Sequence, residues 1–203
     1  MTQSVVGVST GTDKYLNSES RSIGGTAREE QIVHAGQGYI PTYTIESDDA
    51  AVNTANAHIL QIMADGSNYS RLMRLWVTPT EDLPASIGHF KLALYRLTTA
   101  GTGGAALSDA PHDTADSYGG DMRRNPGTKG TEGQLLRTFY RGVDTGAQRG
   151  WAQESNLFYE AKDGTKPIIF GIADTEGIAV KVIDALASTS VLVTAEVITT
   201  AYL

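Results

Sequence analysis

The sequence predicts an all-β fold: an antiparallel β-sandwich of jelly-roll type with an extended N-terminal arm. From Tyr43 onward, short segments rich in β-branched residues recur at intervals of roughly ten residues. Most of them alternate apolar and polar side chains, which is typical of a half-buried strand. No segment after Gly66 sustains a period of about 3.6 residues, so we expect no helix there.

The first 40 residues differ in composition from the rest of the chain. They are poor in large apolar side chains, rich in Ser, Thr and Gly, and show neither helical nor strand periodicity. Two interpretations stay open: a flexible terminus, or an arm that becomes ordered only against a neighbouring surface. We therefore expect an extended N-terminal arm over residues 1–40 and a β-sandwich domain over residues 41–203, which is long enough to bury a core.

Four strands are expected in the first half of this domain. Within the third of them, Met73, Leu75 and Val77 share one face. The turn-type cluster Asp65–Asn68 comes directly before it, and we interpret this link as a hairpin. The four expected strands are Thr42–Ile45, Ala57–Ala64, Tyr69–Thr78 and Phe90–Leu97.

A long polar excursion separates these strands from the second half of the chain. It begins at Thr98–Gly104, where three glycines supply backbone angles that other residues reach only with strain. Strand patterning returns at Gln134. We interpret the fold as a β-scaffold that displays its loops.

Five more strands follow the excursion. β-Branched residues dominate most of them, which favours strand over helix. The short connection Ala185–Ser188 is interpreted as a second hairpin. The five strands are Leu135–Arg141, Asn156–Glu160, Pro167–Ile172, Gly177–Asp184 and Ser190–Ile198.

Composition excludes several classes of protein. The formal charge of −7 opposes a general nucleic-acid binder, which needs a basic surface to displace counterions. The absence of cysteine excludes disulfides, thiolate zinc sites and a cysteine nucleophile. No secretion signal and no membrane-spanning run are visible, so we expect a soluble chain made in a cytoplasm and not bound to membrane.

One loop holds candidate metal ligands, because carboxylates beside a histidine suit a hard or borderline cation. The spacing matches no calcium-loop or zinc pattern, and Asp and Gly are also common in exposed turns. We favour a solvated loop and expect no metal and no cofactor. The five candidates are Asp109, His112, Asp113, Asp116 and Asp121.

No catalytic constellation is visible. The sequence has no G-x-S-x-G nucleophile elbow, and the run Gly127–Thr131 lacks the end of a phosphate-binding loop. His58 and His89 lie in expected strands, where we interpret them as packed or solvent-facing. Adjacent carboxylates such as Asp48 and Asp49 could act as a pair in glycoside hydrolysis only at a particular separation in space, which the sequence does not show. We therefore expect a protein that is not an enzyme and assign no catalytic residues.

Arginines and aromatic residues form modest clusters. A nucleic-acid strip is one interpretation, but Arg, Trp and Tyr also anchor protein interfaces, and we favour the second. The residues concerned are Arg71, Arg74, Arg123, Arg124, Arg137, Arg141 and Arg149, with Tyr140, Trp151, Phe158 and Tyr159 nearby.

Three runs carry a resemblance to a known group of proteins. They are Leu94–Gly104 (LYRLTTAGTGG), Asp113–Asp116 (DTAD) and Lys129–Gly133 (KGTEG). Together they resemble a sequence pattern found in tailed-bacteriophage virion structural proteins, closest to head decoration (cement) proteins. The resemblance covers roughly residues 57–200 and leaves the N-terminal arm outside.

The resemblance implies a role and partners. A cement protein has a β-sandwich body, often a jelly roll, without catalytic residues, and it binds across subunits of the major capsid protein on the outer surface of the virion. It also implies a homotrimer, since such proteins commonly occupy symmetry axes. The alternatives that stay open are a tail, baseplate or head-spike protein that binds host glycans, a carbohydrate-binding or other recognition module, and a β-sandwich hydrolase.

Overall fold

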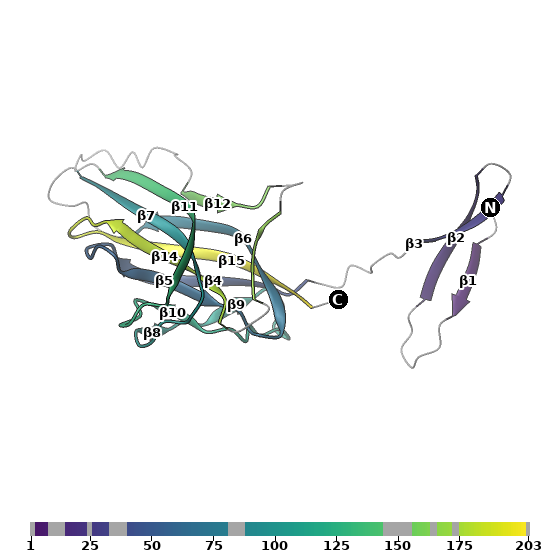
Figure 1. Cartoon of the computed structure of the whole chain (residues 1–203), viewed down its shortest axis with the longest axis horizontal. Helices are drawn as coiled ribbons and strands as arrows, with labels where there is room; N and C mark the ends of the chain where they lie inside the picture. Colours follow the sequence, from purple (N-terminus) through teal and green to yellow (C-terminus); the bar gives the residue numbers. More distant parts are fainter. Residues whose placement is uncertain are drawn as a thin grey trace. The chain divides into compact units, whose positions relative to one another are not determined.

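The computed structural model describes residues 3–7, 15–23, 26–32, 40–80, 88–143, 156–162, 166–171 and 175–201. The chain divides into two compact units, Met1–Ile40 and Pro41–Leu203 (Figure 1).

The first unit contains an antiparallel sheet in the order β1-β2-β3. Its strands are β1 (Gln3–Gly7), β2 (Tyr15–Ile23) and β3 (Thr26–Ile32). Sequence periodicity gave no sign of these strands, because β2 and β3 consist mainly of polar residues that leave no apolar alternation to detect. Residues 1–40 therefore contain strands that pair with one another.

The second unit is built from strands, and none of its described residues is helical. No described helix is long and apolar enough to cross a membrane. The strands are β4 (Thr42–Ala51), β5 (His58–Met63), β6 (Asn68–Pro79), β7 (Gly88–Leu97), β8 (Ala105–Ala106), β9 (Asp109–Pro111), β10 (Met122–Arg124), β11 (Glu132–Val143), β12 (Leu157–Glu160), β13 (Ile168–Phe170), β14 (Gly177–Asp184) and β15 (Ser190–Ala201).

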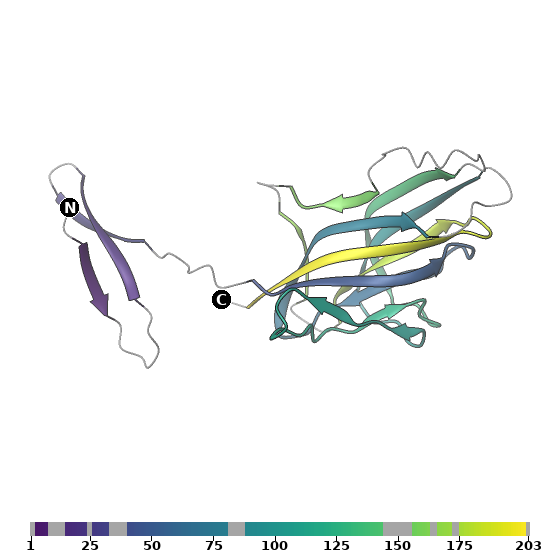
Figure 2. The same cartoon turned by 180° about the vertical axis from the view of Figure 1, so that it is seen from behind.

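Two antiparallel sheets form the unit, in the orders β11-β7-β14-β5-β10-β8 and β12-β6-β15-β4-β9, with β13 paired to β6. The sheet that contains β15 is nearer the viewer in Figure 2. Of the principal strands in chain order, the first, third, sixth and eighth share one sheet (β4, β6, β12, β15), and the others share the second (β5, β7, β11, β14). This is the strand order of a jelly roll. The predicted all-β antiparallel sandwich is confirmed.

The core lies between the two sheets. Ile45, Leu75 and Val193 project into it from one sheet, and all three are fully buried. At the margin formed by β11 and β12, the rings of Phe90 and Phe158 both pack on Phe139, with centroid separations of 6.2 and 5.3 Å. Phe158 comes from the opposite sheet, so this aromatic row joins the two layers.

Both expected hairpins are wrong. The links Asp65–Asn68 and Ala185–Ser188 each join strands of different sheets, β5 to β6 and β14 to β15. They are turns that cross the core, and Asp65 caps the first by accepting hydrogen bonds from the amides of Ser67 and Asn68 at 2.8 and 2.7 Å. The error arose because alternation indicates which face of a strand is buried but does not determine which strands lie beside it in the sheet.

The long excursion is an insertion that runs from Thr98 to Thr131 between β7 and β11. It contains three short strands that sequence analysis missed. In this insertion β9 extends one sheet by pairing with β4, while β10 extends the other by pairing with β5. The insertion therefore runs along the side of the sandwich where β4 and β5 meet, and covers that side.

Candidate functional site: the fastened insertion

The two ends of the insertion pair with each other. Thr102 and Thr128 form an isolated antiparallel bridge, with amide-to-carbonyl distances of 2.8 and 3.0 Å. Nearer the sheet, the amide of Thr98 donates to the carbonyl oxygen of Thr131 at 3.0 Å. Two of the runs that carry the virion-protein resemblance, Leu94–Gly104 and Lys129–Gly133, thus lie side by side.

Glycine is required where these runs approach most closely. A Cβ added at Gly101 would lie 2.5 Å from the carbonyl oxygen of Thr128 and 2.8 Å from Oε1 of Gln61. A Cβ at Gly130 would overlap the carbonyl oxygen of Thr99. Both positions are therefore closed to larger residues unless the insertion moves.

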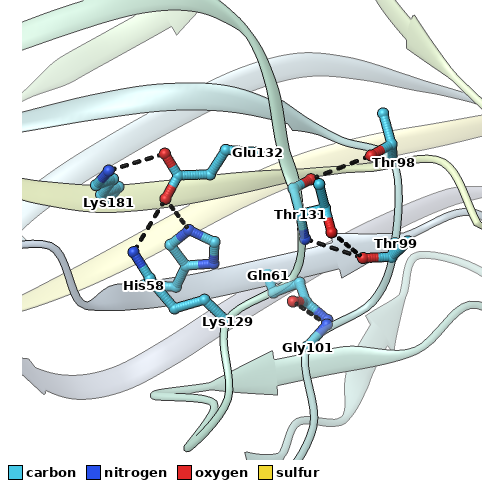
Figure 3. Close-up of polar contacts among 9 residues, drawn as sticks. All are labelled: His58, Gln61, Thr98, Thr99, Gly101, Lys129, Thr131, Glu132 and Lys181. Atoms are coloured by element: carbon cyan, nitrogen blue, oxygen red, sulfur yellow. Dashed lines mark hydrogen bonds and ion pairs between the residues drawn. The ribbon is translucent and has the colours of Figure 1, made fainter.

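The carboxylate of Glu132 fastens the returning end of the insertion to the sheet (Figure 3). Its Oε2 lies 2.8 Å from Nζ of Lys181, and its Oε1 lies 3.1 Å from Nε2 of His58 and 3.3 Å from Nζ of Lys129. Lys181 and His58 stand on the neighbouring strands β14 and β5. Nζ of Lys181 also lies 5.2 Å from the centroid of the Tyr95 ring. One carboxylate therefore contacts three basic side chains.

Burial and hydrogen bonding set the protonation of this cluster. Partial burial acts to raise the pKa of Glu132, but the hydrogen bonds from Lys181, His58 and Lys129 together outweigh it and lower the pKa to about 2. Desolvation dominates at His58, whose side chain has no exposed surface, and it lowers the pKa of the imidazole. The carboxylate is ionised and the ring is neutral near pH 7, so Nε2–H donates to Glu132.

A second contact holds the turn after β7. The amide of Gly101 donates to Oε1 of Gln61 at 2.8 Å, and Gln61 is fully buried on β5. Nδ1 of His58 and Nε2 of Gln61 are buried without a hydrogen-bond partner among the described residues. The insertion thus covers a polar row on the outer face of β5, next to a small apolar cluster of Met63, Leu97 and Ala179.

The middle of the insertion is anchored by Tyr118. This buried side chain donates from its hydroxyl to the carbonyl oxygen of Met63 at 2.7 Å, and its ring lies 5.3 Å from that of Tyr43. Burial raises the pKa of its phenol far above the ordinary range. The backbone amide of Tyr118 donates to Oδ2 of Asp109 at 2.9 Å. Tyr118 therefore positions the loop that follows β9.

The candidate metal ligands of this loop do not converge. No group of three or more His, Cys, Asp or Glu side chains among the described residues is placed to hold a metal ion. Asp113 accepts from the amide of Ala115 at 3.0 Å, Nε2 of His112 lies 3.1 Å from Oγ1 of Thr44, and Asp121 pairs with Arg123 at 2.6 Å. Asp109 accepts the hydrogen bond from the amide of Tyr118. Asp116 is half-buried, and its amide donates to the carbonyl oxygen of Asp113. These groups shape the loop.

The basic clusters are dispersed as well. Arg74 pairs with Glu160 and Glu196 on the outer face of one sheet, and Arg124 lies 3.7 Å from Asp48. Arg141 is buried and donates to Asn156 at 2.6 Å. The His89 ring lies 5.0 Å from that of Tyr140 at the exposed edge. Arg149, Trp151 and His34 lie outside the described residues.

Sequence reasoning placed His58 in a strand, where the structure buries it, but missed its partners. A signal was present in Lys181, the only cation in the otherwise apolar run Gly177–Ile183. A buried lysine requires an anionic partner. The sequence did not show which of the carboxylates supplies it, because Glu132 lies 49 residues away.

The arrangement suits a fastening better than a reaction. His58 has no exposed surface, and Glu132 is already bonded to three donors, so neither group has reach to a substrate proton. Comparison with known proteins adds no relative: no family model, no curated protein and no solved structure matches the chain.

Proposed function

We propose that the protein is a non-enzymatic virion structural protein that decorates and stabilises a bacteriophage capsid. One observation carries the proposal: the runs that resemble virion proteins are used to fasten an insertion against a jelly roll. Their glycines allow close backbone approach, and Glu132 ties the end to the sheet. A rigid body with loops held in fixed positions is what a cement protein presents to a lattice of subunits.

The proposal includes partners and a location. The major capsid protein is the principal partner, the protein itself forms a homotrimer, and the complex lies on the outer surface of the virion. Nucleic acid, membrane and cofactors have no part in it. The jelly roll supports this role because viral capsid domains commonly have that fold, and association of subunits stabilises the folded state by mass action.

The proposal is tested by adding purified full-length protein to capsids assembled without it. We expect saturable binding at a fixed ratio to the major capsid protein and greater resistance of the capsids to heat. A shortened chain of residues 41–203, which retains the compact second unit, should stay folded and bind more weakly. Full-length protein that leaves capsids bare would contradict the proposal.

A second candidate is a tail, baseplate or head-spike protein that binds host glycans. The observation that favours it is the pair of rings at the edge of one sheet, where Tyr140 is 62% exposed and its ring lies 5.0 Å from that of His89, tilted by 30°. An exposed aromatic face can serve as a platform for a sugar ring. Glycan binding that is lost in Tyr140→Ala, with no binding to capsids, would favour this candidate.

A further inference from the structure

One edge of the jelly roll is suited to bind a strand-like surface. β11 ends its sheet, and no described strand pairs with its outer edge. Of the three most exposed large apolar side chains among the described residues, two lie on β11: Leu135 at 47% and Tyr140 at 62% exposed. Unpaired strand edges offer free amide and carbonyl groups, and exposed apolar side chains beside them mark contact surfaces.

This edge is also cationic. Arg137 is exposed on β11 and pairs with Leu94 on the core-facing side, and Lys91 lies on β7 opposite Tyr140, so the two cations flank this edge on opposite faces of the sheet. Neither takes part in any ion pair among the described residues. In a chain with a formal charge of −7, these two cations are available to an acidic partner surface.

The opposite side of the same unit carries an acidic groove. It has a volume of about 590 Å³ and lies between β4 and the segment that joins β8 to β9. β8 and β9 are the last strands of the two sheets, on the side of the sandwich away from β11. Glu46 is exposed, and the side chain of Asp48 is 72% exposed, with its nearest cation, Arg124, 3.7 Å away. The lining residues are Thr44, Glu46, Asp48, Ala106, Leu107, Ser108 and Ala110.

We propose that β11 of one copy docks against this groove of a second copy, head to tail. Arg137 then approaches Glu46, and the exposed side chains of Leu135 and Tyr140 become buried. Because the two surfaces differ, each copy in such a contact still has one surface of each kind free, and the contacts form a ring where the rotation between copies closes. The copy number rests on the homotrimer of the proposed function, whereas the contact itself rests on these surfaces.

Charge reversal tests the contact by native mass spectrometry and sedimentation of the full chain. Arg137→Glu and Glu46→Arg should each raise the dissociation constant of the assembly at least about tenfold, because like charges would then meet. The chain that carries both reversals should assemble like the original. Asp184→Lys, an exposed reversal at the end of β14, is the matched control and should have no effect. Failure of the double reversal to restore assembly would overturn the inference.

Cysteine cross-linking tests the geometry, since the natural chain has no cysteine. Thr138 on β11 and Ser108 in the groove are both exposed. Thr138→Cys with Ser108→Cys in one chain should give cross-linked oligomers with a short bis-maleimide reagent, and each single variant should stay uncross-linked. Cross-linking of Thr138→Cys alone would indicate β11-to-β11 pairing and overturn the head-to-tail contact.

The outcomes separate this inference from the proposed function. Protein that stays monomeric at micromolar concentration but binds capsids would refute the contact and leave capsid decoration standing. Rings that cross-link as expected but leave capsids bare would support the contact and refute capsid decoration.

Discussion

The carboxylate of Glu132 and the ammonium group of Lys181 lie 2.8 Å apart, although β7 separates their strands in the sheet. Glu132 is the first residue of β11 and thus marks the point where the insertion rejoins the sandwich. The pair is largely shielded from water, with 21% and 11% of the two side chains exposed. This contact links the position of the insertion to the stability of the sheet.

Removing the charge of Glu132 should destabilise the body. Glu132→Gln leaves Lys181 without its anion and weakens the bond to His58, so we expect a loss of about 1–3 kcal/mol in the free energy of unfolding. Urea denaturation measures it. Glu160→Gln is the matched control: its pair with Arg74 is 36% and 48% exposed and should contribute less than about 1 kcal/mol. Equal losses in both variants would contradict the special role of Glu132.

Acid should weaken the fold in two stages. The lowered pKa of His58 means that the unfolded chain takes up a proton more readily, so stability present above about pH 6.5 is lost as pH falls below that value. The pKa of Glu132 is lowered from 4.5 to about 2, so a further contribution is lost as pH falls between these values. Urea midpoints measured from pH 7 to pH 2 should show both losses.

Variants assign the two stages. In Glu132→Gln the loss between pH 4.5 and 2 should become smaller, and in His58→Gln the loss just below pH 6.5 should disappear. Profiles that stay parallel to that of the natural chain would show that other groups control the acid response.

A methyl group at Gly130 should loosen the insertion. Gly130→Ala places a Cβ against the backbone of Thr99, which cannot move without breaking the pairing of Thr99 with Thr131. We expect faster amide exchange in residues 98–104 and 127–132 and a lower melting temperature. Gly142→Ala, whose Cβ would meet nothing within 4 Å, should leave both unchanged. Slow exchange retained in Gly130→Ala would contradict the close approach of Gly130 to the backbone of Thr99.

The aromatic row between the sheets should contribute strongly to stability. Phe158→Ala removes a buried ring that packs on Phe139 from the opposite sheet, and we expect a loss of about 3–5 kcal/mol. Tyr140→Ala removes a ring that is 62% exposed and should change stability by less than about 0.5 kcal/mol in the isolated chain. Thermal or urea denaturation distinguishes the two, and similar losses would contradict the assignment of inner and outer faces.

The sequence predicted the sandwich because alternation in segments such as Ser190–Ile198 reports a buried face directly. In Tyr69–Thr78 the expected face of Met73, Leu75 and Val77 is wrong at Met73, because a register shift between Leu72 and Arg74 buries Leu72 instead. The sequence could not predict which strands are neighbours in a sheet. The links at Asp65–Asn68 and Ala185–Ser188 have the composition of hairpin turns, yet each joins strands of different sheets. The strands β8, β9 and β10 have two or three residues each, too few for a period to emerge. Glu132 and Lys181 are 49 residues apart, so only tertiary structure brings them together.

Capsid decoration, the function proposed above, is tested most directly by a cryo-electron-microscopy reconstruction of intact virions from a bacteriophage whose genome carries this sequence. We expect density for the jelly roll of residues 41–203 on the outer capsid surface, in contact with more than one major capsid protein subunit. A side-chain-resolved virion map in which the polypeptide is missing, or in which it occupies only the tail, would contradict it.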